Sequence, residues 1–142
     1  MNQKLILLPL LAQVLLTIIV SLRMVTARVN EMRHKRIHPQ KIATTTGAAQ
    51  QLSDSLKISD NFSNQFETPV VFYTLIILLY VTNMANTMFM ILTSVYVVLR
   101  YVHSYIHCGT NDVMRRFYVF VASAVLLWVS WALFAFELIK YI

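Results

Sequence analysis

The stretch LILLPLLAQVLLTIIVSL, residues 5–22, is apolar over almost its whole length, with Gln13 and Thr17 as its strongly polar interruptions. An α-helix needs about 20 residues to cross the hydrocarbon core of a bilayer. Lipid offers no partner to an unpaired backbone N–H or C=O group, so a segment of this kind must be helical. The stretch therefore predicts a transmembrane helix near the start of the chain.

Three further uncharged blocks follow, at residues 70–81, 84–99 and 117–136. The last reaches the length of a membrane crossing alone, and the other two reach it with a turn from each flank. We predict an all-α integral membrane protein, a single four-helix transmembrane bundle over residues 1–142. The expected segments are helices at about 4–34, 61–83, 85–107 and 112–140, and a cytoplasmic loop at about 39–59.

The composition agrees with this class. Hydrophobic residues make up 58% of the chain and charged residues 13%, which is too apolar for a soluble domain. The single cysteine, Cys108, excludes an internal disulfide, and we interpret it as a structural thiol in a turn. The first helix could instead be a signal peptide. Arg23 ends its apolar run where a cleavage site would place small residues, so we expect the helix to be retained.

The basic residues give an orientation. Ten of the twelve lysines and arginines lie in or beside the first and third connections between the predicted helices, and the second connection, residues 82–87, has no charge. The positive-inside rule makes the basic side cytoplasmic, with both termini outside. The basic stretch at residues 23–41 continues the first helix beyond the bilayer. Contact with lipid headgroups or with a ligand explains its spacing better than nucleic acid does.

Two sets of polar residues at the predicted membrane boundary share helix faces. Asn64 and Glu67 are three residues apart at the start of the second helix, and Arg100, His103 and His107 follow steps of three and four at the end of the third. A carboxylate at the boundary needs a cation or strong donors, and Arg100 is the natural ion-pair partner of Glu67. The two histidines lack a clearly placed third ligand, so we predict no metal site.

Arg115 and Arg116 begin the fourth helix, where a cation opposes the helix dipole. They are either a positive-inside anchor or part of an anion site made with the free N–H groups of the helix. The sequence leaves open which of the two would face such a site. With the polar sets above, they predict a cationic cavity with one carboxylate at the cytoplasmic boundary, suited to an anionic or zwitterionic molecule with an amino group.

These residues carry a family resemblance. Residues 64–73, NQFETPVVFY, resemble the second helix of the MAPEG family, the membrane-associated proteins in eicosanoid and glutathione metabolism, which has an Asn-x-x-Glu step followed by aromatic and proline residues. Residues 100–107, RYVHSYIH, resemble the Arg-x-x-His/Tyr-x-x-x-Tyr end of the third helix. An arginine then begins the fourth helix, here Arg115 or Arg116.

The resemblance implies a homotrimer, by analogy in a bacterial inner membrane, that binds glutathione as a co-substrate between subunits and takes a small lipophilic second substrate. It implies that Arg116, or Arg115, activates the thiol and that Glu67 holds the amino end of glutathione. The other ligand-binding positions that it implies are Asn64, Arg100, His103, His107 and Arg33.

Two departures keep more than one function open. Glutathione-using members usually carry an arginine and other basic residues just before the position of Asn64, where this chain has Asp60, Phe62 and Ser63, and they carry Tyr at the position of His107. The chain is therefore either a glutathione transferase or peroxidase, or a non-catalytic membrane protein that binds another anionic ligand, a lipid or a protein. A channel is a third class, but the polar residues gather at one membrane face and do not line a crossing path.

Overall fold

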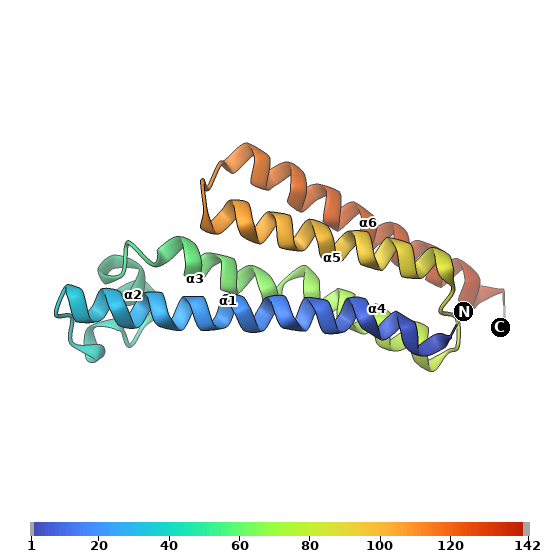
Figure 1. The fold of residues 1–142 in the computed structure, drawn as a ribbon, viewed down its shortest axis with the longest axis horizontal. Helices are drawn as coiled ribbons and strands as arrows, with labels where there is room; N and C mark the ends of the chain where they lie inside the picture. Colours follow the sequence, from blue (N-terminus) through green and yellow to red (C-terminus); the bar gives the residue numbers. More distant parts are fainter. Residues whose placement is uncertain (1, 141–142) are drawn as a thin grey trace.

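The computed structural model describes residues 2–140, which form helices joined by short connections (Figure 1). Within that range there is no β-strand. Four helical segments are long and apolar enough to cross a membrane: Gln3–His34, Leu56–Val81, Thr87–Cys108 and Val113–Ile139. The prediction of an all-α membrane protein with four spans is confirmed.

The regular helices are α1 (Leu7–His34), α2 (Thr45–Gln51), α3 (Leu56–Ser63), α4 (Thr68–Val81), α5 (Thr87–Cys108) and α6 (Val113–Ile139). Short 3-10 turns cover Gln3–Ile6, Pro39–Ile42 and Asn64–Phe66. The second span begins at Leu56, inside the segment expected as a loop at residues 39–59, and it consists of α3 and α4 separated by the third of these turns.

The ends of the spans are set by asparagine and aspartate. Asn86 Oδ1 accepts a hydrogen bond of 3.1 Å from the Phe89 N–H at the start of α5, and Asp112 Oδ1 accepts one of 3.1 Å from the Arg115 N–H at the start of α6. Such caps satisfy N–H groups that the first helical turn leaves free. Asn83 and Asn111 adopt left-handed φ angles of 58° and 52° after α4 and α5, a conformation that asparagine tolerates well.

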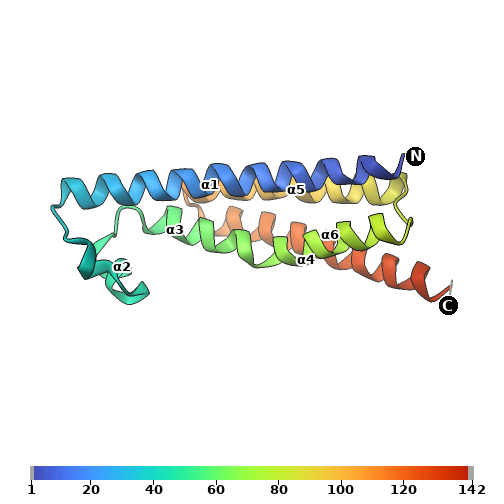
Figure 2. The same cartoon turned by 90° about the horizontal axis from the view of Figure 1, so that it is seen from below.

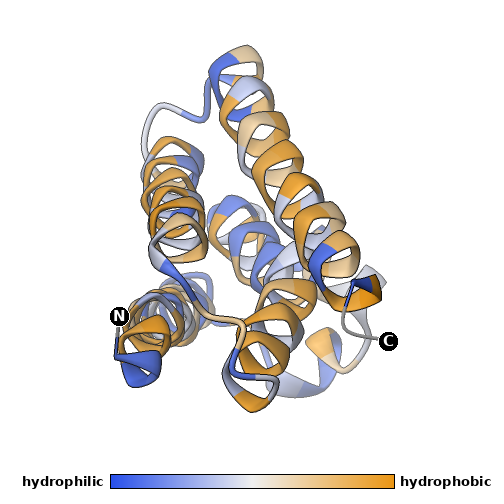
Figure 3. Cartoon of the chain, turned by 90° about the vertical axis from the view of Figure 1, so that its right-hand side faces the viewer, coloured by the Kyte–Doolittle hydropathy of each residue, from blue (hydrophilic) through white to orange (hydrophobic). Residues whose placement is uncertain are grey.

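The helices pack as a bundle with an apolar interior. α5 and α6 form an antiparallel hairpin, and α1 lies along α3, α4 and α5 (Figure 1, Figure 2). The buried rings of Phe72 and Tyr96 stack with centroids 4.6 Å apart. The outer faces of the helices are also rich in apolar residues (Figure 3), and exposed side chains such as Leu11, Leu22 and Trp128 suit contact with lipid.

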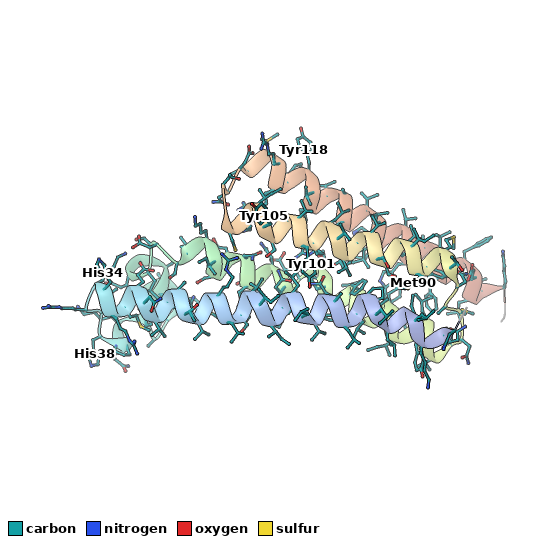
Figure 4. The ribbon with its side chains drawn as sticks, in the orientation of Figure 1. His34, His38, Met90, Tyr101, Tyr105 and Tyr118 are labelled. Atoms are coloured by element: carbon teal, nitrogen blue, oxygen red, sulfur yellow. The ribbon has the colours of Figure 1, made fainter. Side chains whose placement is uncertain are left out.

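Both ends of the described chain lie at one end of the bundle, as four crossings require (Figure 1). The first and third connections lie toward the opposite end, and α1 extends past the turn between α5 and α6 (Figure 1). His34 and His38 lie at this extended end, and Tyr118 lies near the start of α6 (Figure 4). The basic residues of the two connections therefore gather on one side of the bundle.

Glu31, near the end of α1, fastens the first connection to the bundle. Its buried carboxylate accepts hydrogen bonds from the Ser55 N–H at 2.8 Å, the Ser55 hydroxyl at 2.7 Å and the Asp54 N–H at 3.0 Å, immediately before α3 begins. Lys35 also donates to Glu31, and this hydrogen bond raises the pKa of Lys35 above its ordinary value. Glu31 thus supplies the acceptor for N–H groups that precede the first turn of α3.

We expect Glu31→Ala to lower the free energy of unfolding by about 2–3 kcal/mol, because several donors lose one charged acceptor. Thermal unfolding of the purified protein in detergent measures this change, and limited proteolysis should cut within residues 36–54 sooner than in the unaltered protein. Asp54→Ala is the matched control, since it removes an exposed ion pair with Lys35 and an exposed hydrogen bond from the Ser53 hydroxyl but keeps the backbone hydrogen bond to Glu31. Equal stability of the two variants would contradict the role given to Glu31.

Candidate functional site

The second span is interrupted between α3 and α4. α3 ends at Ser63, a 3-10 turn follows, and Glu67 has φ −93° and ψ −104°, outside the helical region. Pro69 explains the break, because proline lacks an N–H and fits an α-helix only in its first turn. A new helix must therefore begin close to Pro69, and it begins at Thr68.

A cleft lies between this break and the α5–α6 hairpin. Its volume is about 240 Å³. The residues that line it come from the broken span, from α5 and from α6: Asn64, Glu67, His103, Val113, Arg116, Phe117 and Phe120. The structure therefore brings four of the predicted site residues together, Asn64, Glu67, His103 and Arg116, although the helix face on which the first two were placed is interrupted.

Arg116, and not Arg115, faces the cleft. Arg116 Nη1 donates to Asn111 Oδ1 at 2.8 Å and lies 3.1 Å from His107 Nε2. The side chain of Arg115 is 76% exposed, and its Nε lies 3.4 Å from a carboxylate oxygen of Asp112. One step along a helix turns a side chain by about 100°, so these neighbours point in different directions. Of the two arginines between which the sequence did not decide, Arg116 is thus the one that lines the cleft.

Arg100 takes a different partner from the one expected. Its residue is fully buried, and its Nη2 donates to the Asn64 backbone carbonyl at 2.8 Å. Among the residues that the structure describes, no ion pair within 4.0 Å joins Arg100 to Glu67, whose side chain is exposed. Asn64 is the C-cap of α3, where carbonyls lack intrahelical partners, so the break itself presents the acceptor that Arg100 uses.

The two histidines of α5 are buried and have different neighbours. His103 Nδ1 lies 3.2 Å from the backbone carbonyl of Arg116, which can only accept, so Nδ1 carries the proton. In the neutral ring Nε2 is then an acceptor, and His103 lines the cleft. His107 lies behind Arg116 and contacts its guanidinium. Within residues 2–140, no three His, Cys, Asp or Glu side chains are grouped closely enough to hold a metal ion.

Arg33 is exposed near the end of α1 and does not line the cleft of its own chain. Cys108 is the last residue of α5, and its Sγ lies 3.2 Å from Asn61 Nδ2. Asn61 also donates to the Ser104 hydroxyl at 2.7 Å, which ties α3 to α5. The contact between Asn61 and Cys108 agrees with a structural role for this thiol.

The sequence analysis missed the apolar wall of the cleft. Val113, Phe117 and Phe120 lie on the same face of α6 as Arg116, separated by steps of three and four. The same spacing describes any buried helix face, so the signal was present but not distinctive. The analysis also missed the buried hydrogen bond of 3.1 Å from Gln13 on α1 to Gln65, which holds the broken span against the first helix.

One comparison with known proteins finds a matching family. A family model described as the MAPEG family matches residues 6–136 of the chain. The matched region includes every residue that lines the cleft and all four spans except a few terminal residues. No curated protein and no solved structure matches the chain.

Proposed function

The chain belongs to the MAPEG family, and on that premise we propose that it is a membrane enzyme that joins the thiol of glutathione to lipophilic electrophiles or uses it to reduce peroxides. The family includes glutathione transferases and peroxidases as well as non-catalytic members. The observation that carries the proposal is the Arg116 guanidinium at a cleft that also contains a carboxylate and an aromatic wall.

Arg116 would activate the thiol. A guanidinium beside a sulfur favours the thiolate over the thiol and lowers the pKa of the thiol. The S–H proton leaves to solvent, and the thiolate sulfur forms a bond to the electrophilic carbon. The electron pair of the bond that breaks at this carbon moves to the leaving group or into the neighbouring π system. The polar residues bind the peptide part of glutathione, while Phe117 and Phe120 offer an apolar surface to a substrate that arrives from the bilayer.

Glu67 would bind the ammonium group of glutathione. Its carboxylate lines the same cleft as Arg116 and has no ion-pair partner within 4.0 Å among the residues that the structure describes. Asn64, at the same break, adds an amide that both donates and accepts. A zwitterion that places its thiol at Arg116 and its ammonium at Glu67 matches both charges.

A neighbouring subunit would complete the site. A volume of about 240 Å³ lies below the roughly 300–1,000 Å³ of most ligand pockets. We therefore propose the homotrimer that the family resemblance implies, with the exposed Arg33 of one chain near the cleft of the next. The basic end of the bundle would face the cytoplasm, because basic connections favour that side.

The second candidate is a non-catalytic protein that binds another anionic ligand, a lipid or a protein partner. Phe62 and Ser63 favour it, since they put no cation before Asn64, and the cleft lining has a single arginine. Saturable binding of glutathione without turnover of any electrophile, or no binding at all, would support this candidate over the enzyme.

We expect Arg116→Met to lower kcat/KM for glutathione and a chromogenic electrophile by about 100-fold, since the thiolate loses its nearest cation. Arg115→Met is the matched control and should keep its activity, because Arg115 points away from the cleft. Circular dichroism and the melting temperature verify that both variants fold. Equal activity of the two variants would exclude Arg116 as the activating residue.

We expect Glu67→Gln to raise the KM for glutathione about tenfold, the loss of one charge-assisted hydrogen bond. With a glutathione analogue that lacks the amino group, the same substitution should change KM little. The test compares the change in KM that Glu67→Gln causes for glutathione with the change that it causes for the analogue. A similar rise for both would assign Glu67 a structural role.

Native mass spectrometry from detergent micelles should give a trimer, and a cysteine pair at Arg33 and Val113 should crosslink between chains. The crosslink is expected because the proposal places Arg33 beside the neighbouring cleft, whose lining includes Val113. The pair at Arg36 and Val113 serves as the comparison. A monomer of full activity would contradict the shared site.

A further inference from the structure

His107 is a buried histidine in contact with the cation of the cleft. It is 3% exposed, and its Nε2 lies 3.1 Å from Arg116 Nη1. A guanidinium has only donors, so Nε2 must supply a lone pair and the ring proton must be on Nδ1. The contact therefore requires a neutral imidazole in one tautomer.

The same arginine nitrogen has a second acceptor. Asn111 Oδ1 lies 2.8 Å from Arg116 Nη1, and Asn111 belongs to the turn between α5 and α6. Arg116 Nη1 is thus held between the last turn of α5 and the connection that follows it. Neither acceptor lines the cleft, so both leave the guanidinium available to a ligand there.

We propose that His107 positions Arg116 through a hydrogen bond that exists only while the imidazole is neutral, which makes the cleft sensitive to acid. Protonation of Nε2 removes the lone pair and places two cations in contact, so Arg116 loses one of its two acceptors. The inference rests on the proposed function for its effect on turnover, but the hydrogen bond itself does not depend on it.

The charges that face His107 come from three helices. Arg116 approaches from α6, Asp60 from α3, and Arg100 and His103 from α5 itself. The ring of His103 lies at a centroid distance of 5.8 Å from that of His107. Arg116 and Arg100 oppose a positive charge on the His107 ring, and Asp60 favours it. Protonation of His107 in acid therefore replaces its hydrogen bond with Arg116 by repulsion between two cations.

Nitrogen-15 NMR of histidine-labelled protein without ligand tests the hydrogen bond. At neutral pH the His107 ring should be the Nδ1–H tautomer, with assignment by His107→Gln. In Arg116→Met it should return toward the commoner Nε2–H tautomer, while Arg115→Met should leave it unchanged. A proton on Nε2 in the unaltered protein, or a tautomer that ignores Arg116→Met, would overturn the inference even if glutathione is not the ligand.

The pH profile of kcat/KM tests the consequence for catalysis. His107→Gln keeps an acceptor that does not titrate, so its acid limb should fall with slope one, whereas the limb of the unaltered protein should steepen beyond one as thiol and imidazole both gain protons. His107→Phe should lower kcat/KM at neutral pH about tenfold, which corresponds to one unit in the pKa of the thiol. Identical profiles for the unaltered protein and His107→Gln would refute the acid sensitivity.

Discussion

Hydrocarbon contains no hydrogen-bond partner, and the structure depends on this constraint at every point where a helix stops. In residues 2–140 most helices stop at the ends of the spans, and the second span is also interrupted within its length, between α3 and α4; at several of these points side chains supply the missing groups. Asn86 and Asp112 accept from the first turns of α5 and α6. At the interruption of the second span, Arg100 donates to the Asn64 carbonyl at 2.8 Å. The buried guanidinium thus gives a donor to a carbonyl that the broken helix leaves free, although its Nε and Nη1 have no hydrogen-bond partner among the described residues.

The interruption of the second span also forms the cleft. Pro69 ends the continuity of the second span, and the resulting turn directs Asn64 and Glu67 to a cleft instead of to neighbouring positions along a regular helix. Arg100 is used inside the protein, which leaves Arg116 as the cation at the cleft. The two arginines therefore have different roles. Arg100 stabilises the fold at the break, and Arg116 is available to a ligand. The buried contact between Gln13 and Gln65 holds the broken span against α1.

Membership of the MAPEG family fits this arrangement and makes the departures of the chain informative. Histidine at position 107 accepts a hydrogen bond from Arg116, a contact that a neutral ring allows and a protonated ring forbids. Phe62 and Ser63 put no cation before Asn64, so the charge of the cleft depends on Arg116 and Glu67. An aromatic wall lies beside these charges, as the proposed reaction of a polar thiol with a lipophilic substrate requires.

The four spans and the side on which basic residues gather follow from the sequence alone, because the length and polarity of a segment decide whether it can enter a bilayer. Sequence also selected Asn64, Glu67, His103 and one of the pair Arg115 and Arg116, and the structure places the first three and Arg116 around one cleft. It wrongly paired Glu67 with Arg100, because helical spacing assumes a continuous helix and the break at Glu67 removes that assumption. Only the tertiary structure separated Arg116 from Arg115 and placed His107 behind it. Those outcomes depend on the turn from α5 into α6, whose geometry is set by the packing of the hairpin and by Asn111 in a left-handed conformation.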